Sequence, residues 1–249
     1  QVKCIWCVPK YSNPEGIVYS DEVVRRFASL KPAAPDFTIM WDNAYCIHEF
    51  EGEYVPFPDI ISMCAKASNP DMVYEFASTS KVSFAGGGIS AIAASKANLD
   101  FIKKSMTIQT IGYDKVNQLR HVRYFKNLDG IKVHMKKHAD MMRPKFEAVV
   151  SCLEKELGGL EIGSWIKPKG GYFITFESLD GCAKAIVEKC KEAGVVLTKA
   201  GACFPYGNDP KDSVIRIAPS FPTPEEMAQA TELFVLCVKL VSVNKLLEA

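Results

Sequence analysis

Lys81 closes a short run, residues 76–81, that carries Ser78 and Ser80 and is followed at once by the glycine-rich residues 84–88. A lysine amine forms Schiff bases with carbonyl compounds. Serine hydroxyls donate hydrogen bonds to a phosphate, and glycines let backbone amides approach one closely. An amine held against an anchored phosphate is what attachment of pyridoxal phosphate requires. Ser-x-Ser-Lys alone, however, also fits an ordinary surface loop.

Three apolar, β-prone runs precede the polar residues of interest and are predicted as strands: residues 3–8, 37–41 and 72–77. Each run ends just before chemically useful side chains: Asn13 follows the first, Asp42 and Tyr45 the second, and Lys81 the third. Open α/β sheets bind ligands beyond the carboxyl ends of their strands. We therefore expect these side chains to gather at one edge of a sheet.

The residue types match the needs of a pyridine cofactor. A carboxylate such as Asp42, paired with the pyridine nitrogen, keeps that nitrogen protonated, so that the ring accepts electrons from the substrate. Tyr45 and Asn13 are suited to hydrogen-bond the phenolic oxygen and favour its anion. Together with Lys81, these residues predict amino-group chemistry on pyridoxal phosphate.

At these positions the sequence resembles the fold-type I, class I aminotransferases, whose motifs occur here in order as Asn13-Pro14-Glu15-Gly16, Asp42-Asn43-Ala44-Tyr45, Ser78-Thr79-Ser80-Lys81 and the late Arg216. Longer strings, residues 41–45, 77–88, 114–121 and 215–222, are similar to the MocR-like aspartate aminotransferase subgroup. The resemblance spans nearly the whole chain of 249 residues.

The resemblance implies a role for each matching residue. The catalytic residues are Lys81, Asp42 and Tyr45; the cofactor-binding residues are Asn13, Asp42, Tyr45, Ser78, Ser80 and Lys81; the substrate-binding residues are Asn13 and Arg216. Many class I relatives place an arginine shortly after the lysine to hold the phosphate, whereas Gly88-Ile89-Ser90 occupies that region here. The phosphate must therefore be held differently.

Arg216 lies within an apolar run, residues 214–218, that is predicted as a strand. A guanidinium between buried neighbours needs a carboxylate partner, and a substrate α-carboxylate would meet that need with two hydrogen bonds. A rim residue over packed neighbours is the alternative. For a side-chain carboxylate of the substrate, Lys115, Arg120 and Arg123 are equal candidates.

The predicted fold class is α/β. The resemblance implies the C-terminal part of a pyridoxal phosphate-dependent transferase large domain, mostly parallel with helices on both faces, at residues 1–129, and an α+β small domain with its linker helix at residues 130–249. We expect the chain to be a fragment that lacks the N-terminal part of such an enzyme. In the small domain, residues 161–166, 171–176, 195–198 and 214–218 read as strands.

Composition excludes several classes of function. The net charge of +1 gives no electrostatic case for nucleic acid or a membrane surface, and we expect neither as a partner. Nine scattered cysteines fit a reducing compartment, so the cytoplasm is predicted. Cys4 and Cys7 are read as buried core residues, and His134 and His138 as a solvated helix face, so no metal is expected.

The residues and the resemblance together predict an aminotransferase that uses pyridoxal 5'-phosphate to move an amino group between an amino acid, aspartate first, and the keto acid 2-oxoglutarate. A homodimer is expected for the full-length protein. Two alternatives stay open: the effector-binding domain of a MocR-type transcription regulator, and another fold-type I enzyme such as a β-lyase or a decarboxylase.

Overall fold

The computed structural model describes residues 1–50 and 54–248, and the chain divides into two compact units. The first contains Gln1–Lys10 and Ile17–Lys136, and the second contains Tyr11–Gly16 and Lys137–Ala249. The division falls inside one long helix, α5 (Leu128–Leu157), at the place where a linker helix is predicted. The domain division at residue 130 stays a prediction. The sequence did not indicate that residues 11–16 pack with the second unit.

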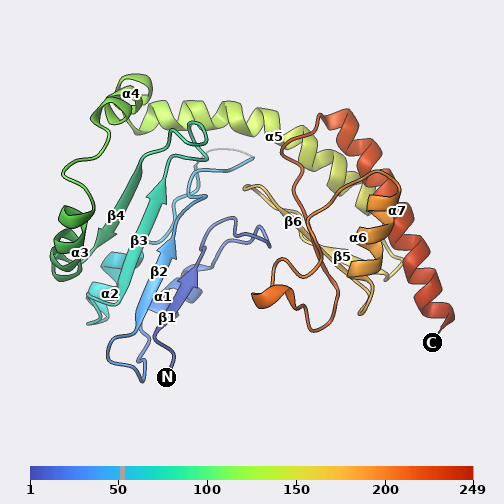
Figure 1. The fold of residues 1–249 in the computed structure, drawn as a ribbon, viewed down its shortest axis with the longest axis horizontal. Helices are drawn as coiled ribbons and strands as arrows, with labels where there is room; N and C mark the ends of the chain where they lie inside the picture. The colour runs from blue at the N-terminus through green and yellow to red at the C-terminus, as the bar shows by residue number, and fades with distance from the viewer. Residues whose placement is uncertain (51–53, 249) are drawn as a thin grey trace. The chain divides into compact units, whose positions relative to one another are not determined.

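The first unit is built on a four-stranded sheet in the order β1-β2-β3-β4 (Figure 1). Its strands are β1 (Cys4–Cys7), β2 (Thr38–Asp42), β3 (Val73–Ser78) and β4 (Ser90–Ala94). The pairs β1–β2 and β2–β3 are parallel, so the ends of these strands meet at one edge, as predicted. β4 is antiparallel to β3 and was not predicted, because its small residues carry no strand pattern.

One face of this sheet is covered by α1 (Asp21–Ala28) and α2 (Ile60–Lys66), as Figure 1 shows. Ser20 caps α1 by accepting a hydrogen bond from the Val23 amide. The core under these helices includes Cys7, Ile39 and Trp41.

Side chains alternate across a strand, so the residues of β1 that alternate with Ile5 and Cys7 lie on the face opposite these helices. Cys4 and Trp6 are there, and both are exposed. The prediction that Cys4 is a core residue is therefore wrong, whereas Cys7 is buried as expected. Trp6 leaves 69% of its surface exposed.

After β4 the first unit continues through α3 (Lys96–Gln109) and α4 (Lys115–Phe125) into α5. The side chain of Asp114 caps α4 by accepting a hydrogen bond from the Asn117 amide at 2.9 Å. His121 and Phe125 are the buried residues of α4. His121 Nε2 lies 3.0 Å from the Ser83 hydroxyl, and Phe125 belongs to a core cluster that includes Val82, so both residues pack against the segment that follows Lys81.

The second unit holds a three-stranded antiparallel sheet in the order β5-β6-β7. Its strands are β5 (Gly163–Trp165), β6 (Ile174–Ser178) and β7 (Val214–Ile217), and its helices after α5 are α6 (Ala183–Glu192), the short 3-10 turn η1 (Pro205–Gly207) and α7 (Pro224–Leu247). Thr223 and Glu226 form a capping box at the start of α7. This α+β pattern agrees with the sequence prediction.

Residues 195–198 are an exception, because the structure describes them fully and they form no strand. The Val195 amide donates back to the carbonyl oxygen of Cys190 in α6, and Val196 is 81% exposed. The segment therefore continues from the helix end as a loop.

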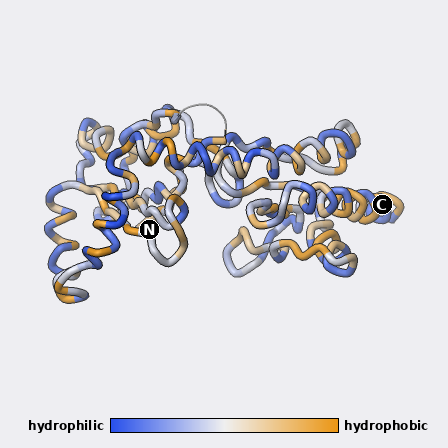
Figure 2. Tube along the Cα trace, turned by 90° about the horizontal axis from the view of Figure 1, so that it is seen from above, coloured by the Kyte–Doolittle hydropathy of each residue, from blue (hydrophilic) through white to orange (hydrophobic). Residues whose placement is uncertain are grey.

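Hydrophilic and hydrophobic residues alternate along the helices in Figure 2. Among residues 1–50 and 54–248, no helix combines the length and the apolar character that crossing a membrane would require.

Candidate active site

Lys81 lies in a tight turn directly after β3. The amides of Val82 and Ser83 both donate to the carbonyl oxygen of Thr79, at 2.9 and 2.7 Å. The hydroxyl oxygens of Ser78 and Ser80 lie 2.9 Å apart, and the Ser80 amide donates to the Ser78 hydroxyl at 3.1 Å. The strand end thus presents two neighbouring hydroxyls and an exposed lysine within one turn.

Tyr45 lies beneath this turn. The Lys81 amine is 4.6 Å from the centre of the Tyr45 ring, within the range of a cation–π contact. Buried His48 packs edge-on against Tyr45, with its ring centre 5.6 Å away, and its Nε2 lies 3.1 Å from the Lys81 carbonyl oxygen. The structure therefore brings Tyr45 and Lys81 together, as predicted, and adds His48, which the sequence did not indicate.

Asp42 is the last residue of β2 and is half-buried. It is paired in register with Phe76 of β3, so it lies on the same face of the sheet as Ser78, two residues further along. The indole Nε1 of Trp6 donates to Asp42 Oδ2 at 3.3 Å. The carboxylate, the serines and Lys81 therefore come from the adjacent ends of two parallel strands.

A second carboxyl, that of Glu75, lies on the other face of β3, in register with buried Trp41. Burial raises the pKa of Glu75, and a 2.9 Å hydrogen bond from the Asn43 side chain opposes this effect. The two neighbouring carboxyls thus occupy different environments on opposite faces of the sheet.

The glycine-rich loop packs directly against the lysine turn. A Cβ atom placed on Gly88 would lie 2.7 Å from the backbone nitrogen of Ser80, so a larger residue would displace the turn. The Thr79 amide donates to the Ile89 carbonyl oxygen, and the Ile89 amide donates to the Thr79 hydroxyl, both at 2.9 Å. Here the glycine allows close approach of two backbone segments.

Arg216 and Asn13 meet in the second unit. The Arg216 Nη1 donates to the Asn13 side-chain oxygen at 2.8 Å, Nη2 lies 3.5 Å from the Thr198 hydroxyl, and the guanidinium stacks over the Phe173 ring at 4.8 Å. The Arg216 Nε is buried and has no hydrogen-bond partner among the residues that the structure describes. Arg216 is thus held by neutral groups, and within residues 1–50 and 54–248 its guanidinium forms no ion pair.

The segment that carries Asn13 is fixed to β6. The Thr175 hydroxyl donates to the Pro14 carbonyl oxygen at 2.8 Å, and the Gly16 amide closes a turn onto the Ser12 carbonyl oxygen at 2.7 Å. Gly16 has a φ of +70°, which an L side chain rarely adopts. The Asn-Pro-x-Gly motif is therefore a turn that sets the Asn13 side chain beside Arg216.

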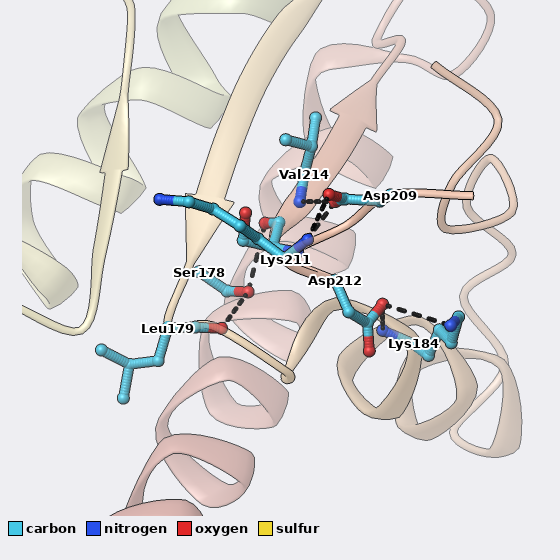
Figure 3. A network of polar contacts seen from close by, with 8 residues as sticks. Ser178, Leu179, Lys184, Asp209, Lys211, Asp212 and Val214 are labelled. Atoms are coloured by element: carbon cyan, nitrogen blue, oxygen red, sulfur yellow. Dashed lines mark hydrogen bonds and ion pairs between the residues drawn. The ribbon is translucent and has the colours of Figure 1, made fainter. Parts of the chain in front are cut away.

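Asp209 organises the entry to β7, the strand that carries Arg216 (Figure 3). Its carboxylate accepts hydrogen bonds from the amides of Lys211, Ser213 and Val214, at 3.0, 2.9 and 2.9 Å. Burial alone would raise the pKa of Asp209, but these bonds outweigh burial and lower it. Sequence reasoning missed Asp209, although an aspartate shortly before a strand is a known turn signal.

Of the three candidates for a substrate side-chain carboxylate, Arg120 borders a pocket of about 240 Å³ with Phe84 and His121. Its guanidinium lies 6.0 Å from the Phe84 ring centre. Within the part of the chain that the structure describes, neither Lys115 nor Arg123 borders this pocket.

Similarity to known proteins identifies the family to which the chain belongs. The family model described as aspartate amino-transferase matches residues 1–249. The chain belongs to the aspartate aminotransferase family. An aspartate aminotransferase of Corynebacterium glutamicum is 39% identical over 242 residues, which cover 97% of this chain and 56% of that protein.

Solved structures of aminotransferases superpose on this chain. An aspartate transaminase from Corynebacterium glutamicum superposes with a TM-score of 0.96 at 38% identity, covering 98% of this chain and 57% of that one. LysN, an α-aminoadipate aminotransferase from Thermus thermophilus, superposes with a TM-score of 0.76 at 19% identity, a likeness of fold alone. The chain spans somewhat more than half the length of these relatives.

Aminotransferases of this family use pyridoxal phosphate, and the first unit has the donors that this group needs. The exposed Lys81 amine suits its aldehyde, and the hydroxyls of Ser78 and Ser80, 2.9 Å apart, suit its phosphate. The Asp42 carboxylate, on the same sheet face as Ser78, suits the pyridine nitrogen. The residues present therefore fit the cofactor.

Proposed function

We propose that the protein is a pyridoxal phosphate-dependent aminotransferase that moves an amino group between aspartate and 2-oxoglutarate. The observation that carries the proposal is the lysine turn: Ser78 ends β3, Ser80 and Lys81 follow it, and the turn lies beside Tyr45 and next to the strand end that bears Asp42. The name of the Corynebacterium glutamicum relative supports aspartate as substrate.

Each candidate residue has a defined role in this proposal. Lys81 Nζ would hold the cofactor through its aldehyde group and, when it is not so bound, would accept the substrate α-proton as general base. Asp42 holds a proton on the pyridine nitrogen, and Ser78 and Ser80 donate to the phosphate. When bound, pyridoxal phosphate supplies the electron sink for the substrate α-carbon. The Tyr45 and Asn13 side chains donate to the phenolic oxygen.

Arg216 binds the substrate α-carboxylate, and Asn13 orients it. An arginine presents a planar pair of N–H groups that match a carboxylate, and the Phe173 ring at 4.8 Å restricts the guanidinium plane. The neutral partners of Arg216, Asn13 and Thr198, leave its charge to be matched by an incoming anion. An amino acid, rather than a simple amine, is the substrate that fits.

Borohydride reduction of the loaded protein, followed by peptide mapping, tests the proposal. The experiment uses the full-length native protein. The pyridoxyl group is expected on Lys81, and Lys81→Ala should abolish labelling. Lys66→Ala, which changes an exposed lysine at the end of α2, is the matched control and should label normally. Labelling of another lysine, or of none, would refute the mechanism.

Incubation of the loaded protein with aspartate alone separates the alternatives. A transaminase forms oxaloacetate in an amount equal to the enzyme and then stops until a keto acid is added. A β-lyase or a decarboxylase turns over without a keto acid, and an effector-binding domain binds aspartate without converting it. We also propose that the protein belongs to the MocR-like subgroup and forms a homodimer, because of the resemblance. Its composition supports a cytoplasmic location.

A further inference from the structure

His121 of α4 lies behind the lysine turn and is 95% buried, with a relative exposure of 5%. Its Nδ1 is 2.9 Å from the carbonyl oxygen of Asn117, one helical turn earlier. Its Nε2 is 3.0 Å from the Thr79 hydroxyl and 3.0 Å from the Ser83 hydroxyl. These two hydroxyls flank Lys81, so one imidazole contacts both sides of the turn.

The hydrogen-bond partners determine where the ring proton lies. A carbonyl oxygen only accepts, so Nδ1 must carry the hydrogen toward Asn117, and in the neutral ring Nε2 is the acceptor. The Thr79 hydroxyl already accepts the Ile89 amide at 2.9 Å, which leaves its own hydrogen for Nε2. The chain of contacts therefore runs from α4 through His121 and Thr79 to the glycine-rich loop.

Asn117 makes the second connection from the same face of α4. Its side-chain amide donates to the carbonyl oxygens of Gly87 and Gly88, at 2.8 and 3.4 Å. Gly88 in turn packs against the backbone of Ser80. Residues four apart on a helix share one face, so Asn117 and His121 act side by side.

We propose that Asn117 and His121 are positioning residues that fix the Lys81 turn and the glycine-rich loop to α4. The inference rests on the proposed role of Lys81 and extends it, because neither residue needs to touch the cofactor. Rigid support of this kind holds a reactive amine within the narrow range of geometry that catalysis needs. These contacts with α4 order the segment Gly88-Ile89-Ser90, which has no arginine to hold a phosphate.

Two substitutions of His121 separate its bond to the Asn117 carbonyl oxygen of α4 from its contacts with the two hydroxyls of the turn. His121→Gln places an amide oxygen near the position of Nε2 and keeps an acceptor for Thr79 and Ser83. His121→Asn places its amide near Nδ1 and keeps only the bond to the helix. If the contact with the turn matters, the asparagine variant is impaired and the glutamine variant is largely rescued.

The first readout is backbone hydrogen exchange in the cofactor-free protein of native length. We expect His121→Asn to speed exchange of the Thr79 and Ile89 amides by about tenfold, the equivalent of one lost buried hydrogen bond, and His121→Gln by much less. Asn69→Ala, which removes a 2.9 Å hydrogen bond to Ala28 near the opposite end of β3, should leave both amides unchanged.

The second readout is a double-mutant cycle with Thr79→Val, which removes the hydroxyl at nearly constant volume. Thr79→Val removes both the contact with His121 and the hydroxyl that accepts the Ile89 amide, so His121→Asn should add little further to Ile89 exchange in the Thr79→Val background. Additive effects, or wild-type exchange in His121→Asn, would overturn the inference. A general rise in exchange that His121→Gln does not rescue would also overturn it, because His121 would then support the fold as a whole.

In the loaded protein, His121→Asn should lower kcat about tenfold with little change in KM for the amino acid, since the lysine is misplaced while substrate binding is intact. If borohydride labels a lysine other than Lys81 while the exchange effects stand, the proposed function fails and the support by α4 does not. If Lys81 is labelled and the variants do not change exchange, the proposed function stands and the support of the turn by α4 fails.

Discussion

Replacing Arg216 with lysine removes the contacts that make this side chain a reader of carboxylates. Lysine keeps the charge but loses the planar pair of N–H groups, the 2.8 Å bond to Asn13 and the 4.8 Å stacking on Phe173. If Arg216 reads the α-carboxylate, substrates that carry one lose binding and alignment together. A simple amine makes no use of the guanidinium.

The size of the effect follows from these contacts. A hydrogen bond to a charged group contributes about 1.5–3 kcal/mol, and a cation–π contact about 0.5–2 kcal/mol. Breaking one partner of a desolvated charge pair costs about 2–5 kcal/mol, and the contacts of Arg216 fall in this range. Because about 1.4 kcal/mol corresponds to a factor of ten, kcat/KM for aspartate should fall roughly 30- to 4000-fold.

The assay measures kcat/KM for aspartate, alanine and a simple alkyl amine in the wild type and in Arg216→Lys. The two amino acids should lose activity by similar large factors, and the amine should change little. Arg143→Lys, at a half-exposed position that pairs with Asp140 within α5, is the matched control and should change kcat/KM less than about twofold. Equal losses for all three substrates would mean that Arg216 supports the fold instead of reading the substrate.

Two further variants test the carboxylates of each unit. Asp42→Asn should leave pyridoxal phosphate bound but lower kcat with little change in KM, because a neutral amide does not keep the pyridine nitrogen protonated; near-normal kcat would remove Asp42 from this role. Asp209→Ala leaves three backbone amides without their acceptor and should cost about 2–5 kcal/mol of stability, measured by urea unfolding. Since the folded-state pKa of Asp209 is lowered, its contribution is full above the unfolded value of about 4 and is lost as pH falls through the folded pKa. An Asp209→Ala variant with the same acid sensitivity as the wild type would contradict this assignment.

The first sheet could be predicted because its strands have strong local signals. The apolar runs before Asp42 and Lys81 end where polar residues begin, and β2 and β3 end there too. Parallel pairing then places both strand ends at one edge. Two elements escaped prediction, β4 and α2, because both are short and rely on tertiary contacts more than on pattern.

The Asn13–Arg216 contact shows a different limit of sequence reasoning. The two residues are 203 positions apart, and a linear division of the chain assigns them to different domains. Only the resemblance suggested a shared role in substrate binding. The turn of residues 11–16 leaves the first unit and packs with β6 and β7, and no local pattern encodes such a crossing.

His121 could not be found from its own neighbourhood, since a histidine in a helix is usually half-exposed and has no assigned partner. Its partners are hydroxyls 42 and 38 positions earlier in the chain, and their geometry depends on how the turn after β3 folds. Thr79 gives no signal either, because Ser-x-Ser-Lys draws attention to the serines on each side of it. The middle residue of that motif points instead to α4, where its hydroxyl joins the glycine-rich loop to the helix. A position that the Ser-x-Ser-Lys motif leaves unspecified can therefore have a structural role as specific as that of its neighbours, and the Thr79→Val and His121→Asn cycle measures that role directly.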